Sequence, residues 1–172
     1  MSGHRALLHP SASPRNRGPA APYRQSAEWD PAEGTWTQPT PEAFTHLGGL
    51  ATLDGLAELL RGATPQAELL PSSQPMTQVV RWIASRTVVA FGGPNAWLLP
   101  LFQFDLPLGC VRPCVSPVLA ELRGFLDDRE IALWFVNPND WLDGAQPALV
   151  MFRKLPSVLV AARADRYVAC GA

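Results

Sequence analysis

The sequence predicts a mainly α-helical fold with one small β-hairpin and a disordered N-terminal tail. Three observations support this prediction. First, 47% of the 172 residues are hydrophobic, which is enough to form a core. Most apolar residues after residue 46 recur at helical spacing, and seven of the 18 prolines fall in the first 45 residues. We expect a tail over residues 1–45, a middle part over residues 46–105 and a C-terminal part of four short helices over residues 106–172.

The tail is predicted to stay unfolded because it nearly lacks aliphatic side chains after Leu8. Burial therefore cannot offset the roughly 1 to 2 kcal/mol of backbone entropy that each ordered residue loses. Trp29 and Trp36 are exceptions, since a tryptophan in such a segment often docks on its own domain or on a partner.

The middle part is predicted to fold as helix, helix and hairpin. Apolar residues from Leu50 to Leu60 follow one helical face, with Thr52 or Asp54 as the cap. A second helix is expected over residues 76–85. Two β-prone runs then flank Gly92-Gly93-Pro94-Asn95, which is turn chemistry for a hairpin.

The first two C-terminal helices have clear start signals. Ser116 is a candidate N-cap followed by a proline at the first helical position, and Asp127 or Asp128 is a candidate cap for the next helix. Residues 131–136 are apolar all round, so this second helix should be buried.

The last two helices are expected to begin at Gln146-Pro147 and at Pro156-Ser157. The final helix has an apolar face that we expect to point inward as far as Tyr167.

Composition argues against several function classes. The chain has 14 Lys and Arg against 15 Asp and Glu, so no chain-wide positive field attracts nucleic acid. The sequence offers no Ser/His/Asp set in its ordered part, no Cys/His pair and no phosphate-binding glycine loop, so we expect no enzyme and no cofactor. Cys110, Cys114 and Cys170 lack metal-ligand spacing and are interpreted as free thiols.

No apolar run reaches the roughly 18 residues of a membrane span, and no secretory signal follows the first residue. A cytoplasmic protein without membrane contact is therefore expected.

A helix followed directly by a hairpin over residues 76–99 has the outline of a winged helix-turn-helix. Gln78, Arg81 and Arg86 are then the candidate contacts to operator DNA. Residues 79–90 resemble the recognition helix and wing of excisionase and MerR-like domains. The alternative is a packing unit without DNA affinity, because residues 76–112 hold three arginines and one aspartate, a local charge of only +2.

A second motif lies in the C-terminal part, where Trp134-Phe135-Val136-Asn137 is followed by a Pro-Asn-x-x-Leu-x-Gly-x-x-Pro loop over residues 138–147. Each residue of this loop motif has a structural role. Pro138 ends the buried helix, Asn139 turns the chain, and Gly144 allows a positive φ. Leu142 can fill the core and Pro147 can restart a helix. These structural roles alone would explain the motif as a loop that shapes a helix pair, without any binding function.

This motif, together with the preceding residues 97–105, resembles the toxin-binding domain of the Xre/MbcA/ParS antitoxin family. The resemblance implies a bacterial antitoxin that binds and neutralises a RES- or ParT-type, NAD-consuming toxin and autoregulates its operon. The implied toxin-binding residues are Trp134, Asn137, Pro138, Asn139, Leu142, Gly144, Pro147, Arg163 and Arg166.

The final helix departs from the family, because it carries arginines where many members have acidic residues. A winged-helix transcriptional regulator of the MerR or excisionase type without a toxin partner therefore stays open. The sequence also leaves open whether two copies of the chain form a homodimer.

Overall fold

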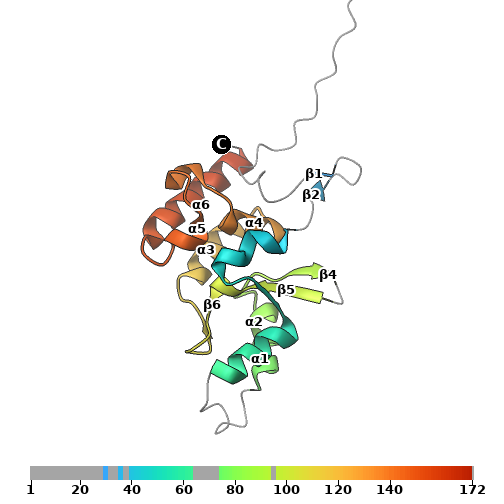
Figure 1. Cartoon of the computed structure of the whole chain (residues 1–172). Coiled ribbons are helices and arrows are strands. Elements are labelled where there is room, and N and C mark those ends of the chain that lie inside the picture. The colour runs from blue at the N-terminus through green and yellow to red at the C-terminus, as the bar shows by residue number, and fades with distance from the viewer. Residues whose placement is uncertain (1–28, 31–34, 37–38, 64–73, 94–95, 172) are drawn as a thin grey trace, which may run out of the picture.

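The computed structural model describes residues 29–30, 35–36, 39–63, 74–93 and 96–171. This part is mostly helical with small antiparallel sheets, which confirms the mainly α class and the presence of a hairpin (Figure 1). Of the tail predicted over residues 1–45, residues 1–28, 31–34 and 37–38 lie outside the described residues. In the described ranges no helix is long and apolar enough to cross a membrane.

The first described elements are β1 (Trp29–Asp30), β2 (Thr35–Trp36) and the 3-10 helix η1 (Pro41–Leu47). β1 and β2 are antiparallel, with Trp29 opposite Trp36. Phe44 of η1 is fully buried in the core. The folded part therefore starts before residue 46, because this one large aromatic side chain anchors the end of the segment that was expected to be a tail.

The middle part is a three-stranded sheet with two helices (Figure 1). Its elements are β3 (Leu50–Thr52), α1 (Leu53–Ala63), α2 (Pro75–Ala84), β4 (Phe91–Gly93) and β5 (Ala96–Pro100). The strand order is β3-β5-β4 and both pairs are antiparallel. The second helix and the presence of a hairpin are confirmed. The first strand is Phe91–Gly93, so Gly92 and Gly93 pair within the hairpin, although the sequence had predicted them to form its turn.

The residues just before the first helix form a strand, although the apolar spacing had extended the helical face back to Leu50. Gly48 and Gly49 take positive φ values of 94° and 88°, which turn the chain out of η1 so that Leu50 pairs with Pro100 as a strand. The helix begins at Leu53, and the Thr52 hydroxyl accepts a hydrogen bond from the Gly55 N–H at 3.1 Å. The predicted Thr52 cap is therefore confirmed.

A short hairpin and the C-terminal helices complete the fold. These elements are η3 (Leu101–Gln103), β6 (Phe104–Asp105), β7 (Cys110–Val111), α3 (Val115–Leu122), α4 (Asp128–Val136), η4 (Asp140–Leu142), α5 (Pro147–Val150) and α6 (Leu155–Cys170). The helix α6 packs along α3 and against η4. The hairpin of β6 and β7 was not predicted.

One predicted cap of the C-terminal helices is confirmed, and two other predictions about these helices are wrong. Asp127 caps α4 through a capping box, in which Asp127 and Glu130 each accept the other's backbone N–H, at 2.8 and 2.9 Å. Burial raises the pKa of Glu130. Ser116 is not a cap, because the turn after β7 already starts α3 at Val115. Tyr167 does not point inward, since the inner face of α6 ends earlier and this side chain is exposed.

Two apolar cores meet at the segment Phe102-Gln103-Phe104. Phe102 belongs to the core beneath the C-terminal helices and stacks on Phe135 with ring centres 5.0 Å apart. Phe104 belongs to the core of α1, α2 and the sheet, with its ring centre 5.5 Å from that of Trp82. Because Phe102 and Phe104 enter different cores, this segment attaches the middle part to the C-terminal part.

Gln103 lies between the two cores and is fully buried. Its Oε1 accepts the Val89 N–H at 2.6 Å, and its Nε2 donates to the carbonyls of Val89 and Pro100 at 3.0 and 3.1 Å. The Gln103 side chain thus pairs with both backbone groups of Val89, as a neighbouring strand would, just before β4 begins.

Candidate functional site

The motif over residues 134–147 folds as the end of α4, the turn η4 and the start of α5. Asn137 leaves the helical conformation, with φ −88° and ψ 150°, because a proline follows it. Asn139 then organises the turn. Its Oδ1 accepts the Trp141 N–H at 3.0 Å, and its carbonyl accepts the Gly144 N–H at 3.0 Å.

Asp165 of α6 holds this loop in place. Its Oδ2 accepts hydrogen bonds from Trp134 Nε1 at 2.7 Å and from Asn139 Nδ2 at 2.8 Å. Its Oδ1 accepts one from Trp141 Nε1 at 2.9 Å. One carboxylate therefore joins the end of α4, the turn η4 and the last helix.

Sequence reasoning missed Asp165 and Trp141 as members of the site. A signal was present, because Asp165 is the one acidic residue between residues 146 and 172. It could not be paired with the motif from the sequence, since the partners lie 24 to 31 residues away along the chain.

Gly144 takes a φ of 76°, as its place in the motif predicted, and the preceding Asp143 takes a φ of 56°. An added Cβ at Gly144 would meet no atom within 4 Å. A larger residue at this position would therefore strain the backbone without a steric clash.

Most of the predicted toxin-binding residues are interior. Trp134, Asn137, Asn139, Leu142 and Pro147 are buried, Pro138 is half-buried and Gly144 is exposed. The buried members cannot touch a partner in this conformation. They shape the loop and set which neighbouring side chains face outward.

Arg163 and Arg166 are exposed and both contact one carboxylate on α3. Arg163 Nε lies 2.8 Å from Glu121 Oε1, and Arg166 Nη1 lies 2.8 Å from Glu121 Oε2. Surface ion pairs of this kind contribute at most about 1 kcal/mol to stability. The two arginines fix α6 on α3 and leave part of each guanidinium group open to solvent.

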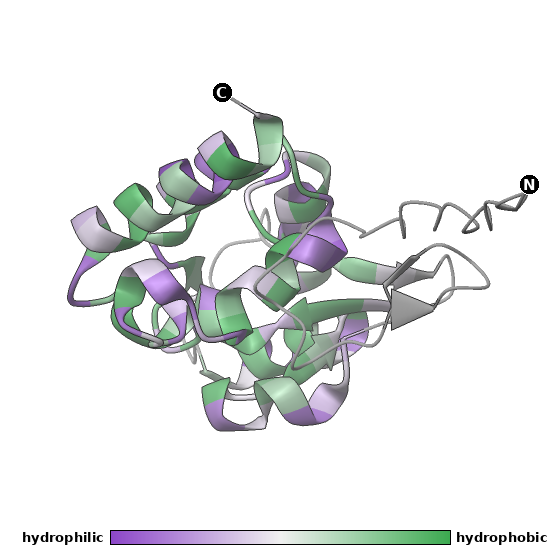
Figure 2. Ribbon diagram, turned by 90° about the horizontal axis from the view of Figure 1, so that it is seen from above, coloured by the Kyte–Doolittle hydropathy of each residue, from purple (hydrophilic) through white to green (hydrophobic). Residues whose placement is uncertain are grey.

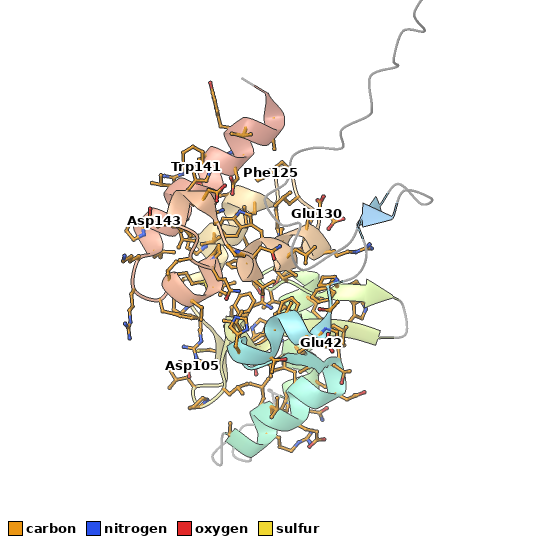
Figure 3. The ribbon with its side chains drawn as sticks, turned by 45° about the horizontal axis from the view of Figure 1, so that its top comes forward. Glu42, Asp105, Phe125, Glu130, Trp141 and Asp143 are labelled. Atoms are coloured by element: carbon orange, nitrogen blue, oxygen red, sulfur yellow. The ribbon has the colours of Figure 1, made fainter. Side chains whose placement is uncertain are left out.

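Four large apolar side chains on η4 and α6 face solvent. Trp141 is 57% exposed, Val160 61%, Tyr167 65% and Val168 68%. Val160, Ala164, Tyr167 and Val168 follow the spacing of one helical stripe. Trp141 lies beside α6 (Figure 3) and is bonded to it through Asp165. Figure 2 shows hydrophobic and hydrophilic segments alternating along this helix. We call the four exposed side chains, Trp141, Val160, Tyr167 and Val168, the α6 face.

The candidate DNA contacts lie at the end of α2. Arg81 and Arg86 are exposed, whereas Gln78 Nε2 donates to the Gly109 carbonyl at 3.0 Å and so connects α2 to the β6–β7 hairpin. Arg86 follows the helix with a φ of 55°. Its N–H bonds to the Ile83 carbonyl in a helix-ending turn that normally favours glycine.

A second guanidinium group lies near Arg86. Arg123 Nη2 donates to the Val88 carbonyl at 2.7 Å and lies 3.5 Å from Asp128 Oδ1. Burial lowers the pKa of Arg123, the positive charge of Arg86 lowers it further, and Asp128 opposes both effects. The end of α2 therefore carries a small positive region.

Among the residues that the structure describes, no group of three or more His, Cys, Asp or Glu side chains is placed to hold a metal ion. The three cysteines are free thiols. No protein-family model, curated protein or solved structure matches the chain. The case for function therefore depends on the geometry of these surfaces.

Replacing Asp165 with Asn should lower the free energy of unfolding by about 2 to 4 kcal/mol, because the new NH₂ group faces one of three donors and the charge is lost. Chemical denaturation with circular dichroism measures this effect. Asp143→Asn is the control, since Asp143 is exposed and asparagine tolerates its positive φ. Equal stability of both variants would show that Asp165 does not hold the loop.

Replacing Gly144 with Val should cost roughly 1 to 2 kcal/mol, because a β-branched residue is poorly tolerated at a φ of 76°. The matched control is Gly124→Val, since Gly124 is exposed, has open space around its Cβ and does not have a positive φ. Thermal melting compares the two. If Gly144→Val melts no lower than Gly124→Val, the left-handed turn is not a constraint on the loop.

Proposed function

We propose that this chain is an antitoxin-like protein that binds a RES- or ParT-type toxin and silences it through the α6 face. The observation that carries the proposal is that Asp165 ties the Trp134 to Pro147 motif to α6, and that Trp141 of the motif and three apolar side chains of α6 are exposed. Clustered apolar side chains on a surface are typical of protein-binding sites. The proposal gives the buried motif residues a positioning role and the α6 face the contact role.

The composition of the face favours a protein partner. Trp141 and Tyr167 are residue types that commonly dominate binding energy at interfaces, and Arg163 and Arg166 form a charged border beside them. An ordinary interface buries about 1,600 Å² in total. The α6 face supplies the apolar centre of such an interface, and the exposed Asp140 and Asp143 beside Trp141 supply part of its edge.

The double change Tyr167→Asp and Val168→Asp should weaken toxin binding by at least a hundredfold, because two charges then face the apolar centre of the interface. Both side chains are mostly exposed, so the fold should be kept. Calorimetric titration with the toxin encoded by the neighbouring reading frame measures binding, and growth rescue on co-expression measures neutralisation. A chain that ends at Leu155 should also fail, since it lacks nearly all of α6.

The control for that double change is Leu59→Asp on α1, where an exposed apolar side chain lies outside the α6 face. It should bind and rescue as the unchanged chain does. If the unchanged chain forms no complex with the neighbour, or if the double variant binds as tightly, the antitoxin proposal is wrong.

A second candidate function is DNA binding by a winged helix-turn-helix. The supporting observation is the element order η1, β3, α1, α2, β4, β5 with the sheet order β3-β5-β4, in which a helix pair precedes a hairpin whose second strand pairs with the strand before the helices. The helix α2 has one fully buried residue, Val79, and exposes Arg81. Such a unit would let the antitoxin regulate its own operon.

Arg81→Gln combined with Arg86→Gly should weaken DNA binding and reduce its salt dependence by about two phosphate contacts. Glycine suits the φ of 55° at residue 86, so the charge is removed without added backbone strain. Fluorescence anisotropy with a random 30-base-pair duplex and with DNA upstream of the gene measures both quantities. Arg153→Gln is the control, and absence of binding by the unchanged chain at low salt would reject this function.

A further inference from the structure

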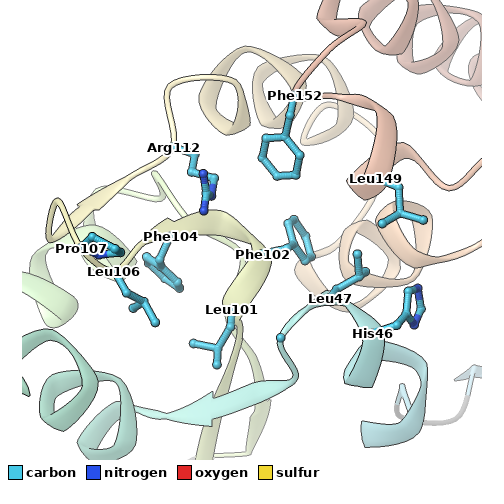
Figure 4. A pocket seen from close by; sticks show the side chains of 11 residues that line it. His46, Leu47, Leu101, Phe102, Phe104, Leu106, Pro107, Arg112, Leu149 and Phe152 are labelled. Carbon is cyan, nitrogen blue, oxygen red and sulfur yellow. The ribbon is translucent and has the colours of Figure 1, made fainter. Parts of the chain in front are cut away.

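A groove opens between the two cores of the molecule. It consists of two cavities, of about 420 and 380 Å³, which share Arg112 and Phe152. The larger cavity is lined by the end of η1, by η3, by β6 with the turn after it, by Arg112 just after β7, and by α5 with the turn that follows (Figure 4). We call the two cavities together the Arg112 groove.

The walls of the larger cavity are apolar and aromatic. Phe102 and Phe104 form its floor between the cores, and Phe152 stands opposite them with Leu106 and Leu149 at the sides (Figure 4). Phe152 and Leu149 are 46% and 51% exposed, so the groove is open to solvent. Large apolar side chains at the edge of an open groove suit a partner that covers them.

Arg112 is the charged group in this groove and is incompletely paired. Its Nη1 lies 3.4 Å from Asp105 Oδ2, which is long for a charge-assisted hydrogen bond. Its buried Nε has no hydrogen-bond partner among the described residues. The guanidinium group lies 5.1 Å from the centre of the Phe152 ring.

The charge balance of the larger cavity favours an anion. Its lining includes Arg112 and His46 and no acidic residue, whereas Asp105, which lies 3.4 Å from Arg112, lines the smaller cavity. His46 Nε2 already shares a hydrogen bond of 2.6 Å with Gln146 Oε1, so Arg112 is the group with donors to offer. A carboxylate would complete the pairing of this guanidinium group in a partly dry position.

We propose that the Arg112 groove binds a short protein segment in which a carboxylate stands beside a large apolar side chain. The carboxylate pairs with Arg112, and the apolar side chain lies against Phe152 and Leu149. A small-molecule ligand usually has roughly 70–90% of its surface buried in its pocket. This groove stays open on one side, so a protein segment is favoured over a free small molecule. The bulk of the partner covers that side.

The Arg112 groove is separate from the α6 face. No residue lines the groove and also belongs to the α6 face, the predicted toxin-binding residues or the predicted DNA contacts. The two proposals therefore do not depend on each other. A chain that fails to bind a toxin would still bind its acidic segment through the groove.

Selection of phage-displayed random dodecapeptides on the full-length chain tests the proposal. We expect enrichment of peptides with Glu or Asp next to Leu, Phe or Trp. The most enriched peptide is then synthesised with a fluorophore and titrated by anisotropy. Arg112→Gln and Leu149→Ser should each weaken its binding at least tenfold, whereas Arg153→Gln, an exposed arginine outside the groove, should leave it unchanged.

Three further controls make the result interpretable. Changing the acid of the peptide to its amide should weaken binding to the unchanged chain as much as Arg112→Gln does, and thermal melting should show that each variant folds. Arg112→Lys should bind with intermediate affinity, since it keeps the charge and loses the planar donor pair. Enrichment of basic or uncharged peptides, or equal binding by Arg112→Gln and the unchanged chain, would overturn the proposal.

Discussion

The buried amide of Gln103 is the interaction on which the arrangement of the two cores depends. Val89 would otherwise hold an unpaired N–H and carbonyl at the point where the middle part enters the C-terminal core, and an unpaired buried polar group costs about 1 to 3 kcal/mol. Gln103 satisfies both groups, while Phe102 and Phe104 on either side enter different cores. The same segment forms the floor of the Arg112 groove, so the groove exists because the cores are joined at this place.

Asp165 has the corresponding role for the α6 face. Its three bonds bring a helix end, a turn and the last helix together, and they use polar atoms that would otherwise need water. Trp141 is the informative member, because its indole N–H is fixed while much of its ring faces solvent. A tryptophan held rigidly at the surface loses little conformational entropy when a partner covers it. The buried motif therefore prepares a contact surface.

The features that the sequence predicted correctly depend on short-range chemistry. The cap at Asp127, the end of α4 before Pro138 and the positive φ of Gly144 all follow from residues within a few positions. The strand β3, the β6–β7 hairpin and the partners of Asp165 were missed because they need neighbours that only the folded chain supplies, as when Leu50 pairs with Pro100. The Arg112 groove was missed for the same reason, since its walls come from four separate segments.

Hydrogen–deuterium exchange of the full chain, alone and in complex with the toxin from the neighbouring reading frame, tests the central claim most directly. The account predicts slower exchange in the complex over residues 139–147 and along α6, where the motif and the α6 face lie. Exchange that is unchanged there and slowed only over α2 and the β4–β5 hairpin would contradict it, since the toxin would then contact the winged-helix-like part instead.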